Sequence, residues 1–285
     1  MSDFTSNPPG SSLINQSTNQ PVNQSTFQVL NLTLHLADNA LILGHRNSEW
    51  TGHGPILEQD IAISNIALDL IGQSRYLYQY AAELINENSY RYQHVTGRPV
   101  TEDDLAYLRD TREFYNCLLV EQPNGDWAQT ILRQFFFSAF QYFYYQQLYT
   151  SGNERLSAIA EKALKEATYH VKWSSDWVIR LGDGTEESHE RMVNAIGELW
   201  MFTGELFKPA PYEDVAVENG SGVDLQQIEK LWSKKVHDIF EEATLDVPKT
   251  PALQSGGKTG IHTEHLGFLL AEMQFLQRSY PNSTW

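Results

Sequence analysis

The chain has 285 residues, 41% of them hydrophobic, so a compact domain of this length would bury roughly three quarters of its extended-chain surface. Its 36 Asp and Glu residues outnumber its 20 Lys and Arg residues, which gives a formal charge of -16. That charge argues against nucleic acid or an anionic membrane surface as the main partner, because both would repel the chain. The single cysteine, Cys117, excludes an internal disulfide framework and is expected to be a small buried residue.

The first 28 residues differ in composition from the rest of the chain. They consist largely of Ser, Thr, Asn, Gln and Pro, which bury too little apolar area to offset the entropy of ordering, so residues 1–28 are predicted to be a disordered tail. Residues 29–285 are expected to form one domain. The sequence has no signal-peptide pattern and no apolar run near the ~18 residues of a spanning helix, so the expected location is the cytoplasm.

Proline placement predicts long helices in the domain. A proline inside a helix costs about 3 kcal/mol, so the proline-free segments 56–98, 124–208 and 212–247 mark where long helices can run. No convincing alternating strand pattern interrupts them, and we expect an all-α bundle. The predicted helices span residues 31–49, 55–88, 101–115, 126–151, 153–181, 185–206, 223–244 and 263–279.

Capping residues place three of the helix starts. Thr101 followed by Asp104 resembles a capping box, in which each residue satisfies a free backbone N–H of the other. Asp126 and Asn153 are good N-caps because a short side-chain oxygen can accept from the first-turn amides.

Eight aromatic residues cover every face of the predicted helix 126–151. A helix that is apolar all round must be buried all round, so we expect both other helices of this chain and a partner to cover it. The eight are Phe135, Phe136, Phe137, Phe140, Tyr142, Phe143, Tyr144 and Tyr145.

Two motifs near the C-terminus resemble ligand sites but lack required residues. The string GGKTG at 256–260 has Ala252 where a phosphate-binding loop needs glycine, so a flexible lead-in to the last helix is expected. The string HTEH at 262–265 contains the His-x-Glu of zinc deaminases, but their paired cysteines are missing from a one-cysteine chain. A capped helix start near Thr263 is the preferred interpretation.

Glu166 and His170 form the most informative polar pair. Both lie on or beside the inward stripe of the predicted helix 153–181, where an unpaired polar group is costly. Di-iron bundles use Glu-x-x-His from two helices, and here the spacing is one residue longer. A hydrogen-bonded polar pair is therefore expected, while a metal site built around Glu166, His170 and Asp69 is the open alternative.

Four long strings lie between Leu30 and the C-terminus: LTLHLADNALILGHRNSEWTGHGPILEQDIAISNIALDLIGQSR, LLVEQPNGDWAQTILRQF, KALKEATYHVKWSSDWVIRLGDGTEESHERM and SGGKTGIHTEHLGFLLAEMQFLQR. They resemble the structural C-subunit family of phenylacetyl-CoA 1,2-epoxidases. This resemblance implies a ferritin-like bundle with additional helices, paired with a homologous subunit that holds a di-iron centre. It also implies a reductase subunit with FAD and a 2Fe–2S cluster, which passes electrons from NADPH for epoxidation of the aromatic ring by O₂.

The resemblance also implies which residues occupy the metal-ligand positions of the catalytic relative. The matched positions, in chain order, are Leu41, Leu70, Gln73, Ser138, Ala167 and His170. Every carboxylate is replaced and only the histidine remains, so this chain is expected to hold no metal or cofactor and to act as a non-catalytic structural subunit. A one-residue shift of the match would return Glu166 to a ligand position. The alternatives are therefore a di-iron oxygenase subunit and, more weakly, a helical ligand-binding scaffold.

Overall fold

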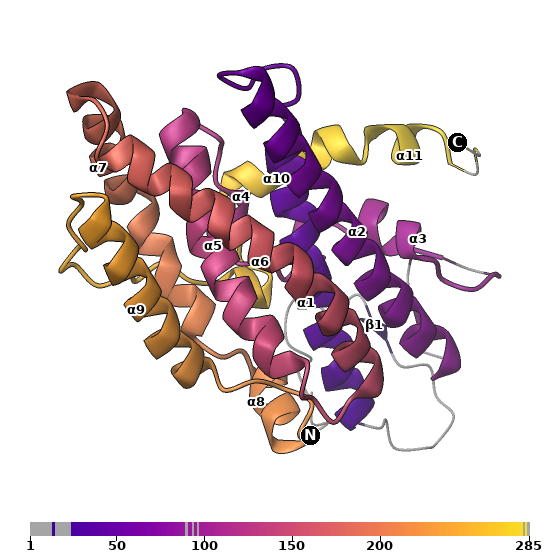
Figure 1. Ribbon diagram of the computed structural model, residues 1–285. Coiled ribbons are helices and arrows are strands. Elements are labelled where there is room, and N and C mark those ends of the chain that lie inside the picture. The colour runs from indigo at the N-terminus through magenta and orange to yellow at the C-terminus, as the bar shows by residue number, and fades with distance from the viewer. Residues whose placement is uncertain are drawn as a thin grey trace, which may run out of the picture.

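Helices form almost all of the regular structure in the computed structural model, which describes residues 13–14, 24–88, 91–92, 94–95, 97–281 and 283 (Figure 1). The longer helices are α1 (Gln24–Ser48), α2 (Leu57–Glu87), α5 (Trp127–Leu148), α6 (Glu154–Gly182), α7 (Glu186–Leu199) and α9 (Leu225–Glu242). The shorter ones are α3 (Glu102–Tyr107), α4 (Leu118–Glu121), α8 (Pro211–Glu218), α10 (Glu264–Met273) and α11 (Phe275–Ser279), with 3₁₀ helices η1 (Thr111–Glu113), η2 (Trp200–Phe207) and η3 (Gly257–Thr259). Strand β1 (Leu13–Ile14) pairs antiparallel with β2 (Arg91–Tyr92).

Two helix pairs make the central bundle. Helix α1 packs along α2, α5 packs along α6, and α2 also contacts α6. The long helices run side by side in Figure 1, with α7 and α9 against α5 and α8 against α1. The buried apolar side chains form one contiguous core. This arrangement confirms the predicted all-α, ferritin-like bundle with additional helices.

The predicted caps stand at the helix starts. Thr101 and Asp104 form a reciprocal capping box at α3. The side chain of Asp126 accepts from the amide of Gln129 at α5, and that of Asn153 accepts from the first turn of α6. Neighbouring residues therefore predict these boundaries correctly.

The predicted helix 101–115 is wrong in its second half, because α3 ends at Tyr107. The guanidinium of Arg109 pairs with the carboxylate of Asp38 on α1, and the amide of Tyr115 donates to the same carboxylate at 2.7 Å. Both contacts lie inside the core. They require non-helical backbone, so a long-range ion pair overrides local helix propensity.

Other boundaries differ at the ends of the chain and after α7. Helix α1 begins at Gln24, inside the predicted tail 1–28, because apolar residues from Phe27 onward already pack on the core. Strand β1 also lies in that tail, and residues 1–12 and 15–23 are outside the described part. The predicted helix 185–206 changes to 3₁₀ geometry at Trp200. The helix predicted at 263–279 breaks at Gln274, and α8 was not predicted.

The aromatic helix α5 is buried, as predicted, but by this chain's own elements. Phe136 contacts Trp232 and Phe240 of α9, and Phe140 contacts Phe207 of η2. Six of its eight aromatic side chains are almost fully buried: Phe135, Phe136, Phe137, Phe140, Tyr144 and Tyr145. Tyr142 and Phe143 are only partly buried, and the partner expected to cover part of this helix stays a prediction. Across the described segments, no helix combines the length and apolarity required to cross a bilayer.

Candidate functional site

The residues matched to metal-ligand positions all lie inside the central bundle. Leu41 comes from α1, Leu70 and Gln73 from α2, Ser138 from α5, and Ala167 and His170 from α6, and each is at most 4% exposed. Four helices thus contribute these positions to the interior of the bundle. Three of the six are aliphatic and carry no donor atom for a metal.

Gln73 is the centre of a hydrogen-bonded network across three helices. Its Oε1 accepts from Nε2 of Gln141 at 2.9 Å and from the hydroxyl of Tyr145 at 3.3 Å. Its Nε2 donates to Oε2 of Glu166 at 2.9 Å. The amide is therefore used on both sides, and it links α2 to α5 and α6.

A second set of neutral groups surrounds Ser138. The hydroxyl of Ser138 accepts from Nε2 of Gln134 at 2.7 Å, and Oε1 of Gln134 accepts from Nδ2 of Asn47 on α1 at 2.6 Å. The buried amides of Asn47, Gln134 and Gln141 were not predicted from the sequence. Their signal is the polar series at 134, 138, 141 and 145, which follows helical spacing through the aromatic run.

Glu166 and His170 do not bond to each other, contrary to the expected pair. Glu166 is held by Gln73, and Nε2 of His170 lies 3.0 Å from Oδ2 of Asp69 on α2. Glu166 therefore has a hydrogen-bonding partner, but it is Gln73 rather than the expected His170. Burial raises the pKa of Glu166 above its ordinary value, against the opposing hydrogen bond from Gln73.

The bundle centre does not offer the donor set of a di-iron site. Such a site needs several anionic oxygens to neutralise two iron ions, whereas the matched positions carry an amide, a hydroxyl, an imidazole and aliphatic side chains. The carboxylate of the neighbouring Glu166 is already bonded to Gln73. The carboxylate of Asp69 lies at the margin, 38% exposed. In the described residues, no three His, Cys, Asp or Glu side chains are grouped so that they could hold a metal ion.

The GGKTG motif is an anchored loop, which corrects the expected flexible lead-in. Lys258 is buried, and its Nζ lies 2.9 Å from Oε2 of Glu213 in α8. The amide of Gly256 donates to Oε1 of Glu205 at 2.7 Å. These contacts attach the loop to α8 and η2. They join residues far apart in the chain, so no local sequence pattern predicts them.

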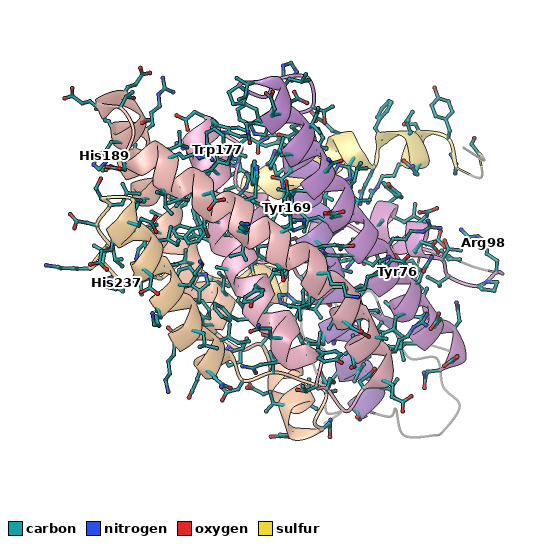
Figure 2. The ribbon with its side chains drawn as sticks, in the orientation of Figure 1. Tyr76, Arg98, Tyr169, Trp177, His189 and His237 are labelled. Carbon is teal, nitrogen blue, oxygen red and sulfur yellow. The ribbon has the colours of Figure 1, made fainter. Side chains whose placement is uncertain are left out.

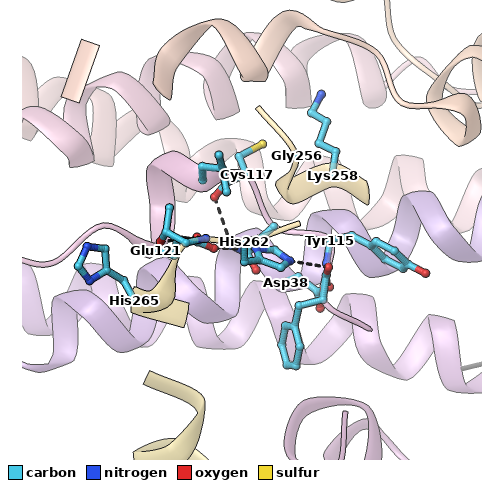
Figure 3. A network of polar contacts seen from close by, with 12 residues as sticks. Asp38, Tyr115, Cys117, Glu121, Gly256, Lys258, His262 and His265 are labelled. Atoms are coloured by element: carbon cyan, nitrogen blue, oxygen red, sulfur yellow. Dashed lines mark hydrogen bonds and ion pairs between the residues drawn. The ribbon is translucent and has the colours of Figure 1, made fainter. Parts of the chain in front are cut away.

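The HTEH motif joins the same polar network (Figure 3). Nδ1 of His262 lies 2.8 Å from Oε2 of Glu121, whose Oε1 accepts from the amide of Thr263 at 2.7 Å. Thr263 is the N-cap residue of α10, as expected, but its hydroxyl bonds to Glu121 rather than to the helix. Burial lowers the pKa of His262, but the hydrogen bond and charge of Glu121 outweigh it and hold the pKa above 6.5.

Cys117 lies in the same region and is fully buried, as expected. Burial raises the pKa of its thiol well above the ordinary value, and the nearby Glu205 carboxylate acts in the same direction. A protonated, inaccessible thiol is a poor nucleophile, so Cys117 is a packing residue.

A groove of about 410 Å³ lies between α2 and α6, beside the Gln73 network. The two helices are antiparallel, since Tyr76 contacts Lys162 while Glu83, farther along α2, contacts the earlier Arg155. The lining of the groove mixes apolar and charged side chains from both helices: Leu68, Asp69, Gly72, Gln73, Tyr76, Gln79, Arg155, Ala158, Ile159, Lys162, Ala163 and Glu166.

The fold and its centre define a ferritin-like helical bundle with no carboxylate at the six positions matched to metal ligands. The sequence pattern of the family described as phenylacetic acid catabolic protein matches residues 7–285, and the chain belongs to this family. It is 46% identical over 258 residues to the C subunit of the 1,2-phenylacetyl-CoA epoxidase of Escherichia coli (strain K12). That alignment covers 90% of this chain and 99% of the relative.

Proposed function

We propose that this chain is a non-catalytic structural subunit of a multicomponent phenylacetyl-CoA 1,2-epoxidase in aerobic phenylacetate degradation. It supports a homologous subunit that holds the di-iron centre and performs the ring epoxidation. The reductase subunit, with FAD and a 2Fe–2S cluster, supplies the electrons, and the whole complex works in the cytoplasm. The similarity to the C subunit of an epoxidase over nearly its full length supports this assignment.

The observation that carries the structural role is the bonding of Gln73. This residue stands at a matched ligand position, yet its amide oxygen and nitrogen already bond to Gln141 and Glu166. Leu41 and Leu70 fill two further positions with hydrocarbon. Binding iron here would require breaking this network and would leave the metal charge almost uncompensated.

The test separates this chain from its catalytic partner. The chain and the partner are purified alone and together, and each preparation is assayed for iron and for NADPH-dependent epoxidation of phenylacetyl-CoA with the reductase present. We expect far less than one iron per molecule in the lone chain, and full activity only when both subunits are present. Near-stoichiometric iron in the lone chain would favour the alternative, an oxygenase subunit with its own metal site around Glu166 and His170.

A further inference from the structure

The outer face of α2 carries a stripe of exposed apolar side chains. Leu57, Ile61, Leu68 and Tyr76 are between 44% and 71% exposed, and their spacing keeps them on one side of the helix. Tyr169 of α6 is also exposed beside this stripe, and Figure 2 shows it with Tyr76 on the same side of the bundle. Exposed apolar side chains gathered on one side of a helix in this way are typical of a surface that a partner covers.

The groove between α2 and α6 continues this stripe and has a floor of small residues. Gly72, Ala158 and Ala163 lie along it, with Leu68 and Ile159 as larger apolar neighbours. A Cβ added at Gly72 would meet no atom within 4 Å, so the helix surface there is open. Small residues at such a place let another helix approach closely, with its own side chains filling the groove.

The charges on the rim of the groove are arranged by sign. Asp69 and Glu166 lie at one end, and Arg155 and Lys162 lie toward the start of α6 at the other. Each is oriented by a neighbour on the facing helix: His170 and Gln73 hold the two acids, while Glu83 and Tyr76 hold the two bases. The rim is therefore preorganised for a partner with the opposite order of charges.

We propose that this face of α2 and α6, from Leu57 to Gln79 and from Arg155 to Tyr169, is the docking surface for an amphipathic α-helix of the homologous catalytic subunit. The proposal rests on the proposed function. The docked helix has an apolar stripe along the groove, basic residues opposite Asp69 and Glu166, and acidic residues opposite Arg155 and Lys162. A second copy of this chain fits less well, because two chains of formal charge -16 repel each other.

A pair of glycine substitutions tests the surface. Gly72→Trp adds an indole at the groove, and Gly197→Trp is the matched control on α7, because an added Cβ meets nothing within 4 Å at either position. Leu68→Asp with the control Leu231→Asp, an exposed leucine of α9, is a second pair in case the first fails to fold. Full-length variants with wild-type circular dichroism and melting temperature are titrated against the purified catalytic subunit by biolayer interferometry.

We expect Gly72→Trp and Leu68→Asp to weaken association at least tenfold, and both controls to bind like wild type. If wild type binds the catalytic subunit and the groove variants bind equally well, the docking surface is overturned while the proposed function stands. A wild-type chain that does not bind the catalytic subunit would overturn the proposed function and, with it, this surface. If the groove variants lose only self-association and still bind the catalytic subunit, the surface belongs to a second copy of this chain. That outcome would also overturn the proposal.

Discussion

The ammonium group of Lys258 lies 2.9 Å from Oε2 of Glu213, and both side chains are almost completely buried. Lys258 also donates to the carbonyl oxygens of Leu206 and Lys208, at 3.2 and 3.1 Å. This one side chain thus ties the loop before α10 to η2 and α8. Because both charges are removed from water, each depends on the other for compensation.

Lys258→Met should lower the free energy of unfolding by about 3–5 kcal/mol, because it leaves the Glu213 carboxylate buried without a counter-charge. Adding Glu213→Gln should recover part of that loss, since the second change removes the orphaned charge. Urea unfolding of the single and double variants measures both effects. The control is Lys234→Met, which breaks the exposed pair with Asp238 and should change stability little. A single variant as stable as wild type would contradict the anchoring role.

The ion pair of His262 with Glu121 should make stability depend on pH. The pKa of His262 is raised above 6.5 in the folded chain, so its charged form is favoured by folding. The contribution of this ion pair to folding stability is complete below about pH 6.5, and it is lost as the pH rises through the pKa of His262 in the folded chain. The stability difference between wild type and His262→Gln should therefore be largest below pH 6.5 and shrink toward pH 9. Urea unfolding across this range, with exposed His53→Gln as the control, measures it; a constant difference would refute the ion pair.

Glu166→Gln should stabilise the chain at neutral pH. Burial raises the pKa of Glu166, so the folded state disfavours its charged form. The resulting loss of folding stability is present when the pH is above the pKa of Glu166 in the unfolded chain, and it disappears as the pH falls below that value. A glutamine keeps an oxygen that can accept from Gln73 without the charge. The melting temperature of the variant should exceed that of wild type at pH 7, and the gain should vanish near pH 4. A lower melting temperature at pH 7 would show that the carboxylate itself is needed.

His170→Ala should affect folding rather than turnover. It removes a fully buried imidazole and orphans its contact with Asp69, so we expect a loss of about 1–3 kcal/mol in the free energy of unfolding. Epoxidation per assembled complex should stay within a few fold of wild type, because the proposed reaction takes place in the partner. The exposed His237→Ala is the control. An assembled His170→Ala complex with no activity would mean that this subunit takes part in the chemistry.

Local sequence determined most of the helical framework. Proline-free segments and capping residues such as Asp126 and Asn153 act within one or two turns, so their effects can be read from neighbouring residues. The composition of α5 likewise predicted that it would be buried. It could not tell which elements cover it, because α9 and η2 lie far along the chain.

Tertiary structure decided the interior contacts. The end of α3 depends on Arg109 meeting Asp38, and the placement of the GGKTG loop depends on Lys258 meeting Glu213, 71 and 45 residues away. The separation of Glu166 from His170 depends on where α2 lies against α6, which gives each residue a different partner. Buried charges and amides take the partners that packing brings near them, and no local pattern in the chain contains that information.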